Sequence, residues 1–234
     1  DKGDTAIEKK VEALLSKMTL EEKLGQMNQI TSYGNIEDMS GLIKQGGAGS
    51  ILNETDPVRI NALQRVAIEE SRLSIPLLMA RDVIHGFKTI FPIPLGQAAS
   101  FNPQVAEDGA RVAAIEASSV GIRWTFAPMI DIARDPRWGR GQETYGEDPY
   151  LTGQLGMAVV RGLQGPEDGK YDKLHACAKH FAVHSGPEWN RHSFDAENIA
   201  PRDLWETYLS AFKDLVKKAD VKEVMCAYNR FEGE

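Results

Sequence analysis

The sequence predicts an α/β protein, and more narrowly the first five strand–helix units of a TIM-like (β/α)8 barrel, truncated. Short apolar runs of strand length alternate with helical patterns along the 234 residues, which is typical of a parallel sheet covered by helices. Polar residues follow the apolar part of each run, and functional groups at the carboxyl ends of strands are characteristic of this barrel. The chain holds five such units, whereas eight are needed to close the barrel.

The helices are predicted from periodicity and capping residues. Apolar side chains recur at helical spacing over residues 11–18, and Thr19 with Glu22 forms a capping-box pattern that opens a second helix. An apolar stripe over Arg202–Ala219 predicts a long amphipathic helix. Three further helices are expected where a capping residue precedes a proline, at Asp56-Pro57, Asn102-Pro103 and Asp148-Pro149.

Five apolar runs are the expected strands: Gly49–Leu52, Pro76–Asp82, Trp124–Ile132, His175–His184 and Glu223–Asn229. A doubly wound sheet stays open as the alternative, because it also binds ligands beyond the carboxyl ends of its strands. Against that fold, no GxGxxG motif follows the first expected strand. Since the sequence stops just after the fifth strand, we expect residues 1–234 to be a single, incomplete barrel domain.

Composition excludes several classes of function. The net charge of −7 argues against nucleic acid as a partner, because phosphate binding needs a basic face. The apolar runs are shorter than the ~20 residues of a membrane helix, so no membrane association is expected. Cys177 and Cys226 lie in strand-like runs and are expected to be buried free thiols. Neither a metal nor a cofactor is expected.

The polar residues expected to carry chemistry follow predicted strands. Asp82 ends the second strand, where a carboxylate can accept hydrogen bonds from hydroxyl groups. A helix cap or an ion pair with Arg81 is the structural alternative. The loop Arg134–Pro149 is dense in Arg, Gly and carboxylates, which is typical of a loop over a site. Lys179 and His180 end the fourth strand and favour recognition of hydroxyl groups.

Six motifs spread over nearly the whole chain point to one family. They are MTLEEKLGQM (18–27), ARDVIHG (80–86), FPIPLGQAASF (91–101), FAPMIDIARDPRWGRGQETYGEDPYL (126–151), AKHFAVHSGPEWNR (178–191) and EVMCAYN (223–229). Together they resemble the N-terminal (β/α)-barrel region of glycoside hydrolase family 3, in particular of bacterial β-glucosidases. The resemblance implies retaining hydrolysis of terminal non-reducing β-D-glucosyl residues, with a β-glucoside oligosaccharide or an aryl glucoside as substrate.

The resemblance also implies a wall that binds the non-reducing sugar. Asp82 resembles the carboxylate that holds two sugar hydroxyls, and Tyr228 resembles the tyrosine that touches the nucleophile. The full set of expected substrate-binding residues is Asp82, Arg140, Lys179, His180, Arg191, Met225 and Tyr228. No catalytic residue is expected in this chain. The nucleophilic aspartate and the acid/base glutamate are expected beyond residue 234, and the family's second α/β domain is expected to be absent.

Several alternatives stay open. A β-xylosidase or a β-N-acetylhexosaminidase of the same family would share the fold, although the PGHG and DSH patterns of the latter are missing. From a different class, the chain is a non-catalytic sugar-binding or split-enzyme fragment. An open sheet would favour association with the remaining C-terminal part or with itself, and the isolated chain is expected to be inactive. The polar opening DKGDTAIEKK fits a mature N-terminus as well as a cytosolic start, and a periplasmic or secreted protein is the expectation.

Overall fold

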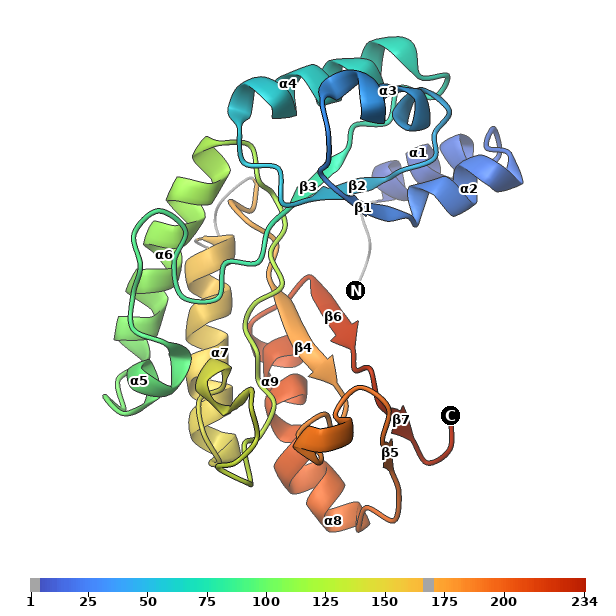
Figure 1. Ribbon diagram of the computed structural model, residues 1–234. Helices are drawn as coiled ribbons and strands as arrows, with labels where there is room; N and C mark the ends of the chain where they lie inside the picture. Colours follow the sequence, from blue (N-terminus) through green and yellow to red (C-terminus); the bar gives the residue numbers. More distant parts are fainter. Residues whose placement is uncertain (1–4, 166–170) are drawn as a thin grey trace. The chain divides into compact units, whose positions relative to one another are not determined.

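The computed structural model describes residues 5–165 and 171–234. The chain divides into two compact units, the first made of Asp1–Arg81 and Val120–Ile122 and the second of Asp82–Ser119 and Arg123–Glu234. Figure 1 shows the elements along the chain. The expectation of a processed N-terminus rests on the opening segment, whose first four residues lie outside the described ones.

The first unit is a small parallel sheet with helices. Its strands β1 (Gln29–Thr31), β2 (Ser50–Leu52) and β3 (Leu78–Ala80) pair in that order. The parallel register places Ile51 of the central strand between Ile30 and Met79. The helices are α1 (Thr5–Leu15), α2 (Leu20–Gln26), α3 (Ile36–Lys44) and α4 (Pro57–Arg65), the last continued by a π-helical turn, Val66–Glu70.

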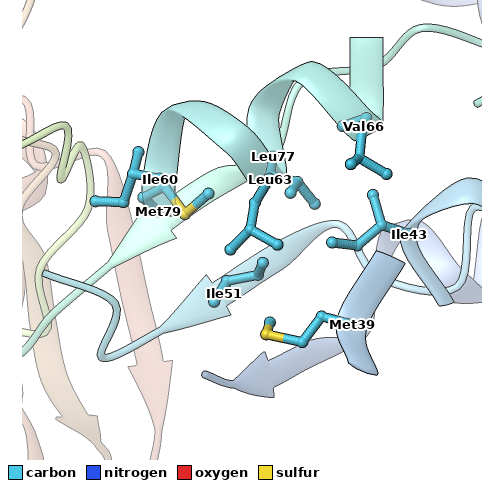
Figure 2. Close-up of a cluster of buried hydrophobic side chains, with 9 residues drawn as sticks. Met39, Ile43, Ile51, Ile60, Leu63, Val66, Leu77 and Met79 are labelled. Carbon is cyan, nitrogen blue, oxygen red and sulfur yellow. The ribbon is translucent and has the colours of Figure 1, made fainter. Parts of the chain in front are cut away.

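The core of this unit forms where α3 and α4 cover one side of the sheet (Figure 1). Figure 2 shows Ile51 from β2 pointing toward Leu63 of α4, with Met39 and Ile43 of α3 beside them. Burying each side chain of this size stabilises the fold by about 1.5–3 kcal/mol. The predicted capping box is confirmed: Thr19 Oγ1 accepts from the Glu22 amide, and the Glu22 carboxylate accepts from the Thr19 amide.

Two elements of the first unit were not predicted. Strand β1 contains a single apolar residue, Ile30, so it lacks the apolar run that identified the other strands. Helix α3 begins at a second capping box, formed by Asn35 and Asp38. Because β1 precedes β2 in the sheet, the expectation that Gly49–Leu52 holds the first strand is wrong, and the five-unit description of the barrel is not confirmed.

The second unit contains two pairs of parallel strands and longer helices. Strand β4 (Cys177–Phe181) pairs with β6 (Glu223–Cys226), and β5 (Asp195–Ala196) pairs with β7 (Arg230–Phe231). Helices α6 (Pro103–Ser119), α7 (Pro149–Gln164) and α9 (Ser210–Lys218) lie side by side, with α5 (Pro94–Ala98) near one end of α6 (Figure 1). The predicted caps hold: Asp148 accepts from the Leu151 amide, and Asn102 accepts from the Gln104 amide.

The expected strand Trp124–Ile132 is extended but irregular. It runs parallel to the segment that holds β4, and two isolated bridges join Trp124 to His175 and Met129 to Lys179. Pro128 lies between these bridges and has no amide hydrogen to donate to a ladder. The segment therefore lies next to β4 without forming a continuous strand, and it places Asp131 beside the end of β4.

The predicted helix Arg202–Ala219 is interrupted. It consists of α8 (Pro201–Asp203), a π-helical turn, Leu204–Tyr208, and α9.

Among the described residues, no helix is both long enough and apolar enough to span a membrane.

Both cysteines carry free thiols, but only one is buried. Cys177 is buried in β4, where burial raises the pKa of its thiol above the ordinary range. The expectation of a buried Cys226 is wrong: its side chain is exposed, because successive side chains of a strand point to opposite sides and those of Val224 and Cys226 lie on the exposed side of β6.

Candidate active site

A cavity of about 320 Å³ opens in the second unit around the carboxyl ends of β4 and β6. Its lining residues are Asp82, Phe126, Arg140, Lys179, His180, Met225, Cys226 and Tyr228. The structure thus brings six of the seven predicted substrate-binding residues together. Arg191 is the seventh, and it is not among the lining residues.

Asp82 and Lys179 form an ion pair at this cavity. Lys179 Nζ donates to Asp82 Oδ2 at 2.9 Å. The lysine side chain is only 3% exposed, whereas that of Asp82 is 41% exposed. A buried ammonium group needs a charged partner, and Asp82 supplies it with one oxygen. Because a carboxylate accepts several hydrogen bonds, Asp82 keeps acceptor positions for a ligand. Arg81, the structural partner considered above, donates to Asn53 instead.

His180 is oriented by a buried carboxylate. Its Nδ1 lies 2.8 Å from Asp131 Oδ2, and its backbone amide donates to the same oxygen at 3.1 Å. Both side chains are almost completely buried. A carboxylate at Nδ1 favours the tautomer with the proton on that nitrogen, which leaves Nε2 as an acceptor. Arg140 Nη1 lies 3.3 Å from this Nε2.

Arg140 is held by a fork-shaped contact with Glu143. Its Nε and Nη2 each donate to one oxygen of that carboxylate at 2.8 Å, an arrangement that fixes the guanidinium plane. Burial favours a higher pKa for the Glu143 carboxyl, but the hydrogen bonds and charge of Arg140 outweigh it, so the pKa is lowered. Glu143 therefore stays ionised, and Arg140 presents its remaining N–H groups toward His180 and the cavity.

Arg191 lies on the loop that follows β4. It does not line the cavity, and its guanidinium donates hydrogen bonds to two residues of the same loop. Its Nη1 donates to Glu188 at 2.8 Å, and its Nε donates to His192 Nε2 at 3.2 Å. The His192 ring packs edge-on against Tyr228, with centroids 4.9 Å apart. Tyr228, which follows β6, is exposed at the cavity. Arg191 is thus connected to the cavity lining indirectly, because it contacts His192 and His192 contacts Tyr228.

His184 was not predicted to belong to this region. It is 1% exposed, and its ring lies 4.7 Å from that of His180 and 6.2 Å from that of Tyr228. Burial lowers the pKa of His184 in spite of the opposing effect of Asp131. The imidazole is therefore neutral at pH 7. Its ring packs against the ring of His180.

The other residues of this region support the wall or add to its lining. Asp131 ends an apolar run as Asp82 does, and this signal marks it in the sequence, although it was given no role in binding. Glu143 stands three positions after Arg140, and a pairing of one of the loop's arginines with Asp135 or Glu143 was expected from the charges of this loop. Phe126 and Cys226 lie within the apolar runs themselves, and nothing in their sequence context distinguishes them from core residues.

The cavity offers one carboxylate and several strong donors. This combination suits a neutral ligand with many hydroxyl groups, because each hydroxyl both donates and accepts. Asp82 is the only carboxylate among the described lining residues, whereas hydrolysis of a glycosidic bond canonically uses two. The described lining of this cavity therefore supplies polar contacts for binding and one carboxylate.

Comparison with known proteins identifies relatives of this chain. Periplasmic beta-glucosidase of Salmonella typhimurium is 37% identical over 222 residues, covering 94% of this chain and 29% of that protein. Xylan 1,4-beta-xylosidase of Xylanibacter ruminicola is 52% identical over 166 residues, covering 64% of this chain and 19% of that protein. The chain thus spans less than a third of the length of either relative.

Solved structures agree with these relatives. A beta-glucosidase from Listeria innocua in complex with glucose matches with a TM-score of 0.83 and 36% identity, over 96% of this chain and 33% of that one. A mutant of the same enzyme in complex with laminaribiose matches with a TM-score of 0.83 and 37% identity, over the same shares. The model of the glycosyl hydrolase family 3 N terminal domain matches residues 19–234. The chain belongs to glycoside hydrolase family 3.

Proposed function

We propose that this chain is the sugar-binding part of a β-glucosidase that removes terminal non-reducing β-D-glucosyl residues with retention of configuration. The observation that carries the proposal is the cavity in which Asp82, Lys179, His180 and Arg140 converge. The nucleophilic aspartate and the acid/base glutamate of the reaction are proposed to come from parts of the enzyme outside this chain.

Each polar residue of the wall has a defined role in the proposal. Asp82 accepts hydrogen bonds from two hydroxyls of the sugar ring, and the Lys179 ammonium, 2.9 Å from Asp82 Oδ2, holds the carboxylate in place. Lys179 and Arg140 donate, and such charge-assisted bonds are about twice as strong as neutral ones. Bonds that strengthen as the ring distorts toward the transition state lower the barrier and not only KM. His180 adds a further polar contact.

The remaining predicted residues shape the wall. Met225 and Tyr228 supply an apolar and an aromatic surface on the side of β6. Arg191, which lies outside the cavity lining, contributes through His192 beside Tyr228.

We propose that the chain as a whole is the beginning of a TIM-like (β/α)8 barrel, in which β1 adds to the five strands expected from the sequence. The parallel pairing of β1, β2 and β3, and of β4 with β6, supports this. Residues 1–234 are then one incomplete domain, and the second α/β domain is a separate part of the enzyme. Within residues 5–165 and 171–234, strand β6 pairs with β4 alone, and we propose that its other edge is covered by the remaining barrel or by self-association.

The experiment expresses the complete reading frame that encodes this chain and compares three aryl glycosides under one condition. We expect kcat/KM to be highest for the β-D-glucoside, lower for the β-D-xyloside and lowest for the β-N-acetylglucosaminide. Residues 1–234 alone should show no turnover, and adding the rest of the enzyme in trans should restore it. A complete enzyme that prefers the N-acetylglucosaminide would overturn the proposal.

β-Xyloside hydrolysis is the second candidate. The observation in its favour is the 52% identity to the xylosidase of Xylanibacter ruminicola, the highest identity among the relatives described above. Xylose differs from glucose by the absence of one hydroxymethyl group, so the same wall accommodates either ring. A kcat/KM ratio that favours the xyloside in the same assay would replace the first candidate by the second.

For localisation we propose the periplasm or the extracellular space. The similarity to the Salmonella typhimurium relative, which is named periplasmic, supports this. Fractionation of cells that express the complete reading frame tests it: activity should appear after osmotic shock or in the medium, and activity retained in spheroplasts would contradict it.

A further inference from the structure

Two loops of the second unit carry side chains toward the cavity. We call residues 134–148 the Arg140 loop and residues 182–194 the Glu188 loop. The first presents Arg140, and the second presents His192 beside Tyr228. Both loops are largely irregular, each with a single turn of 3-10 helix. Their relative position therefore depends on side-chain contacts and not on strand pairing.

Glu188 bonds to both loops with one carboxylate. Its Oε2 accepts from the backbone amide of Gly139 at 2.8 Å, and its Oε1 accepts from Arg191 Nη1 at 2.8 Å. Gly139 belongs to the Arg140 loop and directly precedes Arg140 in the chain. Both oxygens are thus engaged, although the side chain is 44% exposed.

The contact at Gly139, as it stands, leaves no room for a side chain, and a larger residue would displace the Glu188 carboxylate. A Cβ placed at this position would lie 2.6 Å from Glu188 Oε1, inside the van der Waals distance of the two atoms. The carboxylate therefore lies directly against the main chain, and the contact fixes the peptide that leads into Arg140.

Two short paths lead from Glu188 to the cavity. One runs through Gly139 to Arg140, whose guanidinium contacts His180. The other runs through Arg191 to His192, whose ring packs on Tyr228. Glu188 touches neither the cavity nor its lining groups directly. Its effect on ligand binding must pass through the positions of Arg140 and Tyr228.

We propose that Glu188 is a positioning residue that fixes the two loops relative to each other and thereby sets the distance across the sugar-binding wall between Arg140 and Tyr228. This inference rests on the proposed β-glucosidase function. Its physical basis is that a misplacement of about 1 Å in a binding group costs up to ~100-fold in rate, whereas an exposed ion pair contributes at most ~1 kcal/mol to stability.

A matched control exists in the same unit. Glu206 also pairs with an arginine, Arg202, at 2.8 Å, but this pair is on the exposed surface of the helical segment. Glu188→Ala and Glu206→Ala each remove one carboxylate from one arginine. A purely local effect on surface charge predicts the same outcome for both variants.

The test uses the complete enzyme and an aryl β-D-glucoside. We expect Glu188→Ala to lower kcat/KM by at least about 10-fold and Glu206→Ala to leave it unchanged. In the background of Arg140→Ala, the effect of Glu188→Ala should be smaller than in the wild type, because coupled residues are not additive and only the path through His192 and Tyr228 remains. Equal effects of Glu188→Ala in both backgrounds, or an unchanged kcat/KM, would overturn the positioning role.

A second measurement is independent of activity. Hydrogen exchange at the Gly139 amide should accelerate in Glu188→Ala and stay unchanged in Glu206→Ala, because Glu188 is the acceptor for that amide. If the wild-type enzyme shows no glucosidase turnover, the proposed function fails while the exchange result still decides whether the loops are linked. Should Glu188→Ala fail to fold, Glu188→Gln, which keeps an acceptor oxygen but not the charge, serves in both measurements with a smaller expected effect. Unchanged exchange at Gly139 in a folded variant contradicts the link.

Discussion

Glu54 and Asp82 occupy the same kind of position and have opposite surroundings. Each stands two residues beyond a parallel strand, Glu54 after β2 and Asp82 after β3. Glu54 accepts from Ser32, from Arg59 and from the amides of Thr55 and Asp56, and its side chain is 8% exposed. Asp82 has one ion-pair partner and is 41% exposed. The number of internal donors separates a structural carboxylate from one that is free to bind a ligand.

The difference also appears in the energetics of Glu54. Burial by itself raises the pKa of this carboxyl, but the hydrogen bonds from Ser32, Arg59 and the two amides outweigh burial and lower the pKa to about 2. With its oxygens already engaged, Glu54 has little capacity for a further partner. A strand-end carboxylate is thus a candidate for binding only where the fold leaves acceptor positions unfilled.

The largest expected effect is on catalysis by the complete enzyme. Asp82→Ala should lower kcat/KM on an aryl β-D-glucoside by at least ~100-fold, about 2.7 kcal/mol, because the acceptor for two hydroxyls is lost. Asp82→Asn keeps the shape and one acceptor oxygen but removes the charge that pairs with Lys179, so we expect it to lower kcat/KM as well. Glu54→Gln is the control and should change kcat/KM less than about 3-fold. An unaltered kcat/KM in Asp82→Ala would contradict the assignment.

Glu54→Ala should show the reverse behaviour. Removing a buried acceptor leaves Ser32 and Arg59 without their partner, so we expect the free energy of unfolding to fall by about 2 kcal/mol, with kcat/KM unchanged at a temperature where the protein stays folded. Denaturant titration gives the stability, and the same aryl glucoside gives the activity. A large loss of kcat/KM in a folded Glu54→Ala variant would show that the comparison between the two carboxylates is wrong.

Acid should remove the contribution of Glu54 in a defined window. Its pKa is about 2 in the folded protein, against an ordinary value of 4.5, so the folded state favours the ionised form. The stabilisation is fully present above pH 4.5 and is lost as the pH falls toward 2. The difference in unfolding free energy between the wild type and Glu54→Gln should therefore shrink over this range. A difference that stays constant down to pH 2 would contradict the lowered pKa.

His184 should produce a smaller effect in the second unit, at higher pH. Burial lowers its pKa below the ordinary 6.5, so the folded state disfavours the charged form. The resulting stability is present above pH 6.5 and is lost as the pH falls below it. His184→Gln, which is neutral throughout, should remove this acid sensitivity. If both proteins lose stability in parallel below pH 6.5, His184 is not the group responsible.

Much of this arrangement was predictable from local patterns. Asp82, Lys179 and His180 were identified because polar residues end apolar runs, a position at which barrel folds carry functional groups. The caps at Thr19, Asn102 and Asp148 were confirmed because capping depends on a few neighbouring residues. Arg140 lies in a loop dense in Arg, Gly and carboxylates, and Tyr228 ends an apolar run, so local patterns marked both regions. The family motifs gave these two residues their roles and supplied Met225, which no local pattern singles out.

The rest depends on contacts between distant residues. Strand β1 was missed because it is short and mostly polar, and its pairing with β2 defines it more than its own composition does. The Glu188–Gly139 contact joins loops 49 residues apart, and no local signal marks it. Arg191 was expected near the sugar, and only the fold shows that Glu188 and His192 engage it.

The most direct test of the central claim is a crystal structure of the complete enzyme with glucose bound. The sugar should occupy the cavity lined by Asp82, Lys179 and Arg140, with two of its hydroxyls within hydrogen-bond distance of the Asp82 carboxylate and at least one within reach of Lys179 Nζ. Glucose bound elsewhere, with this cavity filled by the protein itself, would contradict the account.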